Sequence, residues 1–191
     1  MNKFDLKNYV GIFDDAISSN ICSSLVNESI NFDWKLFSWT AVSNRNLTYA
    51  PNKYEVGCDT CEIIPPKFKL ILHPLISELT EKYINNYAQN VGSTMGFTPV
   101  KLNRYNTGTH LEKHIDHIHS IFDGQKKGIP IFSIVGLLNE DFEGGEFVLW
   151  DDYVVPLKTG TVIIFPSNFL YPHKVNKITK GIRHSFVSWV W

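Results

Sequence analysis

A double-stranded β-helix, the jelly roll of cupin-like proteins, supported by N-terminal helices is the fold class that the sequence predicts. Three observations favour this mostly β fold with added α-helix. Short segments rich in β-branched and aromatic residues, separated by turn residues, follow one another from residue 98 onward. Amphipathic helical patterns occur in the first half of the chain. Aromatic residues make up 14% of the sequence, which suits a β-rich interior or a lined pocket.

Two helices are expected in the first half. One covers about Ser18–Ile30, where Ile21, Leu25 and Ile30 lie near one stripe. The other covers about Pro74–Val91, with apolar residues repeating at spacings of three and four before Gly92. Amphipathic helices of this kind usually cover one face of a sheet. We therefore interpret residues 1–97 as a helical support region.

Short strands are expected in the second half, where turn residues such as Glu143-Gly144-Gly145 and Lys180-Gly181 punctuate the chain. Seven or eight short strands at this density indicate a sandwich or barrel. Residues 98–191 are interpreted as the jelly-roll core, and residues 1–191 as one domain. The expected strands are Val100–Tyr105, Leu111–Ile118, Ile131–Leu138, Glu146–Trp150, Gly160–Phe165, Pro172–Val175 and Ile182–Trp191.

Charge and hydropathy exclude several function classes. The formal net charge is -1, so the chain lacks the basic excess of a broad nucleic-acid binder. No apolar run approaches the roughly 20 residues that span a bilayer. The first 15 residues include acidic residues where a signal peptide would have an apolar region, so a cytoplasmic protein is expected.

The cysteines are few, and Cys58 and Cys61 form a lone C-x-x-C. A zinc site needs a second ligand pair, and a redox motif needs a helix start, which Glu62–Pro66 does not resemble. We interpret the pair as reduced thiols in a loop or strand.

The most informative pattern is His114-Ile115-Asp116, followed later by His173. Residues i and i+2 of a strand project from the same face, so His114 and Asp116 are expected to reach one ion inside a barrel. Two histidines and a carboxylate form the facial arrangement of non-haem Fe(II) oxygenases. Taken alone, so short a motif arises often by chance, and a pair of surface residues is the more common explanation.

Further motifs at matching spacing surround this pattern, and with them residues 98–191 resemble the 2-oxoglutarate/Fe(II) dioxygenases, most closely the prolyl 4-hydroxylase branch. Residues 1–97 fit only the looser expectation of support helices. The matching positions are Tyr105, Gly108, His114, Asp116, Leu138-Asn139, Gly144-Gly145-Glu146, Pro156, Gly160–Phe165, His173, Arg183 and Trp189.

The resemblance implies a role for each candidate site residue. His114, Asp116 and His173 would bind Fe(II), which 2-oxoglutarate would also chelate. Arg183 would hold the 5-carboxylate of 2-oxoglutarate, because its planar fork matches a carboxylate and keeps its charge. Branch members often have Lys at that position. O2 would be the second cosubstrate, with ascorbate as an optional reductant. The remaining pocket residues would be Tyr105, Ser185, Val135, Leu137 and Trp189.

The other histidines are expected to have lesser roles. His110, His117 and His119 are interpreted as surface residues or as neighbours of the ligands, and His184 should face away from Arg183. The segments Ser120–Pro130 and Ser38–Glu62 are expected to shape the substrate groove.

The implied reaction is hydroxylation of an aliphatic C–H bond, with peptidyl proline as the leading substrate. It would be coupled to decarboxylation of 2-oxoglutarate to succinate and CO2. Asp116 argues against halogenation, because the related halogenating branch has a small residue there. The alternatives are a dioxygenase of a free amino acid or other small molecule, a nucleic-acid demethylase, or a cupin-like binding module without catalysis. The demethylase is disfavoured because Trp189 stands where that branch has a second Arg.

Overall fold

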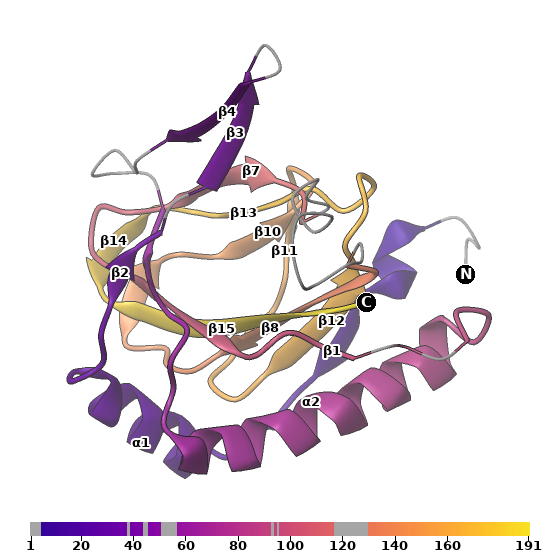
Figure 1. The fold of residues 1–191 in the computed structure, drawn as a ribbon, viewed down its shortest axis with the longest axis horizontal. Helices are drawn as coiled ribbons and strands as arrows, with labels where there is room; N and C mark the ends of the chain where they lie inside the picture. The colour runs from indigo at the N-terminus through magenta and orange to yellow at the C-terminus, as the bar shows by residue number, and fades with distance from the viewer. Residues whose placement is uncertain are drawn as a thin grey trace.

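Two antiparallel sheets packed face to face, with helices on the outer side of the larger one, make up the fold (Figure 1). The larger sheet has the strand order β1-β12-β8-β15-β6-β5-β2, and the smaller has the order β11-β10-β13-β7. This is the predicted helix-supported jelly roll. The computed structural model describes residues 5–37, 39–43, 46–50, 57–92, 94, 96–116 and 130–191.

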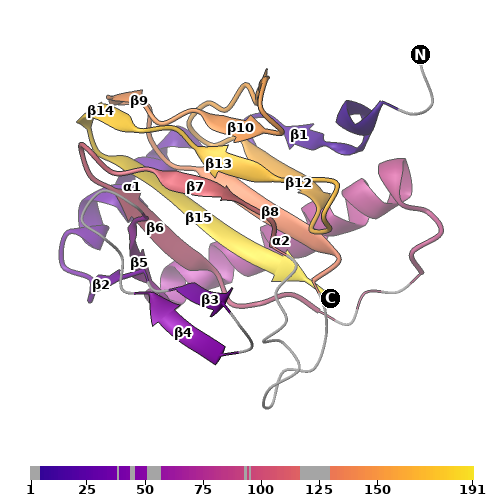
Figure 2. The same ribbon diagram turned by 90° about the horizontal axis from the view of Figure 1, so that it is seen from above.

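The strands are short in both sheets, and two further strand pairs lie beside them (Figure 2). In the large sheet they are β1 (Gly11–Phe13), β12 (Val162–Pro166), β8 (Phe132–Leu137), β15 (Arg183–Val190), β6 (Lys101–Tyr105), β5 (Asp59–Cys61) and β2 (Lys35–Leu36). In the small sheet they are β11 (Tyr153–Val154), β10 (Phe147–Leu149), β13 (His173–Val175) and β7 (Leu111–His114). The separate pairs are β9 (Phe142–Gly144) with β14 (Ile178–Gly181), and β3 (Trp39–Ser43) with β4 (Asn46–Ala50).

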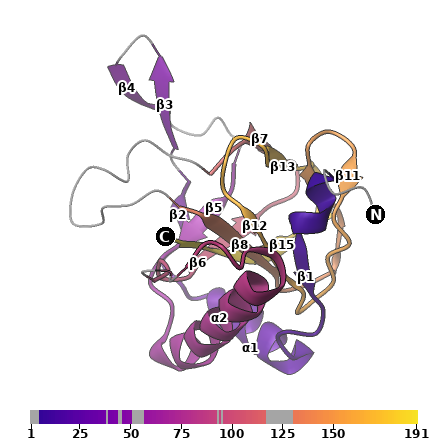
Figure 3. The same cartoon turned by 90° about the vertical axis from the view of Figure 1, so that its right-hand side faces the viewer.

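Both predicted helices are present, and both lie on the face of the large sheet that points away from the small sheet (Figure 3). Helix α1 (Ser19–Ser29) matches its expected range, and a short 3-10 helix, η1 (Leu6–Tyr9), precedes β1. The buried side chains of the helices pack on the sheet in one cluster, which includes Leu25, Leu72, Ile76, Leu102, Ile134, Ile164 and Phe186.

Helix α2 (Pro66–Tyr87) begins eight residues before the expected start at Pro74, which lies inside it. Pro66 occupies the first helical turn, where the fixed φ of proline is favourable and its missing N–H is not needed. Phe68 and Leu72 are buried and extend the apolar stripe that continues through Ile76. The free energy gained by burying this stripe outweighs the cost of Pro74 inside the helix. The interpretation that Glu62–Pro66 does not resemble a helix start was therefore wrong for Pro66, where α2 begins.

Each of the seven predicted strands is present, but β7 ends at His114 and Asp116 lies in a bend beyond it. The structure also has strands that the sequence pattern did not predict. Strands β1, β2 and β5 extend the large sheet from the first half of the chain. Gly144 and Gly181, predicted as turn residues, belong to β9 and β14, which pair with each other.

Cys58 and Cys61 point into different clusters of the protein. Cys61 belongs to the cluster between the large sheet and the helices, and Cys58 to the cluster between the two sheets. The two thiols are not bonded to each other; Cys61 ends strand β5 and Cys58 precedes it. Among the residues described, no helix is both long and apolar enough to cross a bilayer.

Candidate active site

His114, Asp116 and His173 come together between the two sheets. His114 and His173 are direct partners in the antiparallel pairing of β7 with β13. Nε2 of His114 lies 3.5 Å from Oδ1 of Asp116, and Nε2 of His173 lies 3.7 Å from Oδ2. Within the described part of the chain, these three residues form the group of His, Cys, Asp or Glu side chains that could hold a metal, with ligand atoms within 4.8 Å of one another. The predicted proximity is confirmed, although Asp116 reaches the histidines from a bend rather than from a strand.

Hydrogen bonds orient both histidine rings. Nδ1 of His114 lies 2.7 Å from the carbonyl oxygen of Glu112, and Nδ1 of His173 lies 3.1 Å from that of Tyr171. A carbonyl oxygen only accepts, so each Nδ1 carries the proton and donates. Each Nε2 therefore presents its lone pair toward Asp116, as in metal-ligating histidines. Phe147 stacks on the His173 ring at 5.2 Å between ring centroids.

The charges of this cluster suit a divalent cation. Burial alone would raise the pKa of Asp116, but His173, His114 and a 2.7 Å hydrogen bond from Ser133 outweigh it and hold the pKa below its ordinary range. Burial lowers the pKa of His173 to about 4, so its imidazole is neutral. An ionised carboxylate and imidazole lone pairs form the donor set of the 2-His-1-carboxylate Fe(II) site. The residues present therefore fit the metal that the sequence predicts.

Arg183 lies on the same inner face of the large sheet, opposite Tyr105 in the pairing of β15 with β6. Only 2% of Arg183 is exposed, and its Nη1 donates to Oγ of Ser185 at 2.8 Å. Its guanidinium carbon lies 5.4 Å from the centre of the Tyr105 ring. Among the described residues, no carboxylate lies within ion-pair distance of Arg183. A buried cation without an anionic partner is costly, so this arrangement is suited to receiving an anion.

Tyr105 is positioned as a neutral hydrogen-bond donor beside that cation. Burial raises the pKa of Tyr105 well above its ordinary value, so the hydroxyl keeps its proton. Cys58 is buried in the same cluster as Tyr105, and its thiol contributes to the raised pKa of Tyr105. No local sequence pattern places Cys58 at this site, because only strand pairing brings β5 next to β6.

The other predicted pocket residues divide into two groups. Val135 is buried in the same cluster as Tyr105, and Leu137 pairs with Ser185, so both share the inner face with Arg183. Trp189 is six residues from Arg183 on the same strand, or about 20 Å away along an extended backbone. The centre of its ring instead lies 5.0 Å from the ammonium nitrogen of Lys101.

Gly145 is a second residue whose place at the site the sequence did not reveal. A Cβ added there would lie 3.1 Å from Cδ of Arg183 and would overlap the side chain of Ile178. The neighbouring Gly144 faces elsewhere, because its Cβ would overlap the carbonyl oxygen of Lys177. The Gly-Gly pair therefore leaves room for both the Arg183 stem and the β9–β14 pairing.

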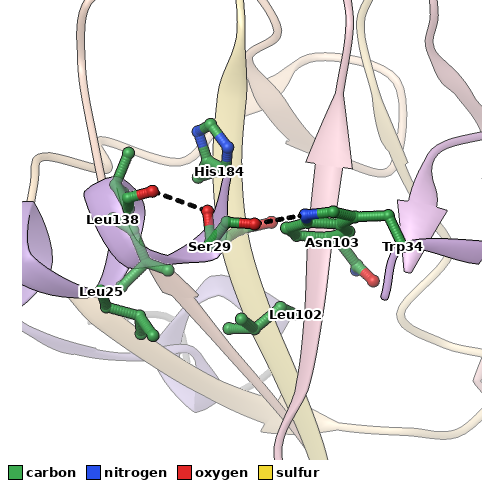
Figure 4. Close-up of a pocket in the computed structure, with 9 residues that line it drawn as sticks. Leu25, Ser29, Trp34, Leu102, Asn103, Leu138 and His184 are labelled. Atoms are coloured by element: carbon green, nitrogen blue, oxygen red, sulfur yellow. Dashed lines mark hydrogen bonds between the residues drawn. The ribbon is translucent and has the colours of Figure 1, made fainter. Parts of the chain in front are cut away.

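His184 faces the helices, as predicted from its alternation with Arg183. It lies with Leu25, Ser29 and Trp34 around a small pocket between α1 and the large sheet (Figure 4). His110 contacts Glu112 at 3.0 Å and takes no part in the His114 cluster. His117 and His119 lie outside the described residues, as do residues 120–129 of one predicted groove segment and residues 38, 44–45 and 51–56 of the other.

Comparison with known proteins agrees with this site. Residues 100–191 match the model of the 2OG-Fe(II) oxygenase superfamily. A PKHD-type hydroxylase of Idiomarina loihiensis is 33% identical over 109 residues, which is 56% of this chain and 48% of that protein. The chain thus spans about half the length of the curated relatives it matches.

Two solved structures share the fold. The viral collagen prolyl hydroxylase of Paramecium bursaria Chlorella virus-1, in complex with 2-oxoglutarate, superposes with a TM-score of 0.67 at 17% identity, covering 95% of this chain and 94% of that one. A Trichoplax adhaerens prolyl hydroxylase in complex with a peptide fragment of a hypoxia inducible factor superposes with a TM-score of 0.64 at 17% identity, covering 96% and 84%. Residues 100–191 thus match the 2OG-Fe(II) oxygenase superfamily that the sequence resembles, and Fe(II) and 2-oxoglutarate are the cofactors that this family's name gives.

Proposed function

We propose that the protein is a hydroxylase of aliphatic C–H bonds that depends on Fe(II) and 2-oxoglutarate. One observation carries the proposal. A fully buried arginine without a carboxylate partner among the described residues lies on the inner sheet face that also borders the His114, Asp116 and His173 cluster. A metal site needs no such arginine, whereas a dicarboxylate cosubstrate needs both a metal-binding end and an anion-binding end.

Arg183 would bind the 5-carboxylate of 2-oxoglutarate. Its guanidinium offers a bidentate pair of N–H donors, already oriented by Ser185 and by the ring of Tyr105. The protonated hydroxyl of Tyr105 would donate to the same carboxylate. Val135 and Leu137 would exclude water from the pocket, which strengthens the ion pair between Arg183 and the cosubstrate.

His114, Asp116 and His173 would hold Fe(II) through one face. When bound, the metal supplies the oxidative chemistry by which O2 hydroxylates the substrate while 2-oxoglutarate is decarboxylated to succinate and CO2. Ser133 would keep Asp116 fixed and ionised through its hydrogen bond, and the two backbone carbonyls would hold the histidine rings in the ligating tautomer. Because Asp116 supplies a carboxylate, the site is suited to hydroxylation rather than halogenation.

The leading substrate is a peptidyl proline. This choice is supported by the prolyl hydroxylases that share the fold, one of which holds a peptide. A free amino acid is the alternative substrate, and the experiment below distinguishes it from a peptide.

The test is succinate release from 2-oxoglutarate in the presence of Fe(II) and candidate substrates. The panel contains proline peptides blocked at both ends, free L-proline and other amino acids, and oligonucleotides, with mass spectrometry of each for added oxygen. We expect succinate and one added oxygen atom with proline peptides. Hydroxylation of free amino acids alone would overturn the peptide substrate, and an absence of 2-oxoglutarate turnover under every condition would overturn the activity.

A further inference from the structure

Lys101 is a charged residue on the inner face of the large sheet that the proposed reaction does not use. It lies four residues before Tyr105 on β6, so its side chain projects from the same face. Its ammonium nitrogen lies 4.9 Å from the centre of the Phe37 ring and 5.0 Å from the centre of the Trp189 ring. Two aromatic rings therefore hold this cation at the end of the inner face that is remote from Arg183.

A surface cavity of about 300 Å³ is lined by Lys101 at the β2 edge of the large sheet. This volume is within the range of small-ligand pockets. Leu36 and Ile63 line it and are 58% and 77% exposed, so the cavity has apolar surface open to solvent. Its other lining residues are Asp33, Lys35, Phe37, Thr60 and Glu62.

Within the described ranges, no carboxylate lies within ion-pair distance of the Lys101 ammonium. Asp33, which also lines the cavity, pairs with Lys35 at 3.7 Å, and Glu62 is exposed. Burial lowers the pKa of Lys101 because its ammonium has lost part of its water. The two rings replace only part of that hydration, since a cation–π contact contributes about 0.5–2 kcal/mol.

We infer that Lys101 determines substrate specificity by binding a carboxylate of the substrate in this cavity. The inference rests on the proposed function, and Lys101 is linked to the metal cluster because Trp189, whose ring lies against Lys101, pairs with Ser133, which donates a hydrogen bond to Asp116. A carboxylate is preferred over a phosphate because Asp33 and Glu62 line the cavity and repel a dianion more strongly than a monoanion. The carboxylate comes either from an acidic side chain near the target residue of a peptide or from the α-carboxylate of a free amino acid.

The test measures binding by isothermal titration calorimetry without O2, with Fe(II) and 2-oxoglutarate present. The probes are proline peptides blocked at both ends that carry Glu, or Gln in its place, at each flanking position in turn, together with free L-proline. We expect one Glu peptide to bind at least about tenfold more tightly than its Gln counterpart, the size of one charge-assisted hydrogen bond. Lys101→Met should remove this difference and leave the KM for 2-oxoglutarate unchanged.

Two variants control for a merely structural role of Lys101. Lys101→Arg keeps the charge and should retain the preference for Glu. Lys67→Met also removes a lysine that lies over an aromatic ring, at 5.1 Å from Phe68, but on α2 and away from the cavity. It should bind both peptides as the unchanged protein does.

The possible outcomes distinguish a failure of the Lys101 inference from a failure of the hydroxylase proposal. Equal binding of Glu and Gln peptides at every position, together with no dependence of free L-proline binding on Lys101, would overturn the inference and leave the hydroxylase proposal intact. A preference for Glu that persists in Lys101→Met would also overturn it. Binding of free L-proline that depends on Lys101 would support the inference and identify the α-carboxylate as its ligand, while counting against a peptide substrate.

Discussion

The two faces of strand β15 differ in chemistry although they alternate residue by residue. Phe186 and Val190 face the helices and belong to the cluster that joins the large sheet to α1 and α2. Arg183 and Ser185 face the small sheet and are just as deeply buried, but they are polar. One strand thus contributes apolar burial from one face and a desolvated cation from the other. Burial alone therefore does not separate residues that stabilise the fold from residues of the candidate site.

Packing on the helix-facing side is so close that position 136 has room only for glycine. Gly136 lies opposite Phe186 in the pairing of β8 with β15, and a Cβ there would overlap the Phe186 ring. On the inner side the stem of Arg183 also packs closely, against Gly145, but its guanidinium contacts a hydroxyl and a ring face rather than apolar groups. Apolar packing on the outer face compensates for the cost of burying the unpaired cation on the inner face.

The largest effect on activity is expected from the metal cluster between the sheets. Asp116→Ala and His173→Ala should each lower turnover of 2-oxoglutarate at least about 1000-fold, equivalent to about 4 kcal/mol, because the remaining donors hold the metal weakly. Thermal unfolding without added metal should change much less. Succinate release and Fe(II) titration measure the two effects, and full turnover in both variants would make the metal assignment wrong.

On the helix-facing side, Phe186→Ala should lower the free energy of unfolding by about 3 kcal/mol, because it empties a fully buried ring site. The KM for 2-oxoglutarate should stay unchanged, since the ring lies on the opposite face from Arg183. Urea unfolding and steady-state kinetics on the folded fraction check both statements. A large rise in KM without loss of stability would break the proposed division between the faces.

Arg183→Met should have the opposite effects to Phe186→Ala, changing the KM for 2-oxoglutarate rather than the stability. The KM for 2-oxoglutarate should rise by a factor equivalent to about 2 kcal/mol, because a charge-assisted pair is lost. The free energy of unfolding should not fall, since an unpaired buried cation is replaced by an apolar chain of similar length. Arg104→Met is the matched control, because Arg104 lies on the helix-facing side of β6 and pairs with Asp59 at 2.8 Å. If the control raised the KM equally, Arg183 would lose its assigned role.

The smallest effect on activity is expected from substitution of the adjacent glycines Gly144 and Gly145. Gly145→Ala should cost about 1 kcal/mol in stability because its φ of 70° lies in the left-handed region, and Gly144→Ala, with φ at 75°, should cost more because its Cβ would also overlap the backbone carbonyl oxygen of Lys177. Only Gly145→Ala should also raise the KM for 2-oxoglutarate severalfold, because its Cβ would press on the Arg183 stem. Calorimetric unfolding and steady-state kinetics of the pair check this. The same KM in both variants would contradict the contact.

Much of the candidate site could be predicted from local patterns. The identities of His114, Asp116, His173 and Arg183 followed from spacing and resemblance, and the separation of His184 from Arg183 followed from strand alternation. The reason given for the proximity of His114 and Asp116 was wrong, because Asp116 lies past the end of β7. The start of α2 was misplaced because burial of Phe68 and Leu72 compensates for a proline inside the helix.

Local sequence was sufficient to identify the residue types of the site, the positions of the main strands and the alternation that assigns side chains to faces. These are local properties, set by a repeat of two residues along each strand. Three contacts became visible only in the folded protein: Cys58 packs in one cluster with Tyr105, Gly145 lies against Arg183, and the Lys101 ammonium lies near the rings of Phe37 and Trp189. These contacts join segments far apart in the chain, and they depend on the pairing of whole strands, which no short stretch of sequence encodes.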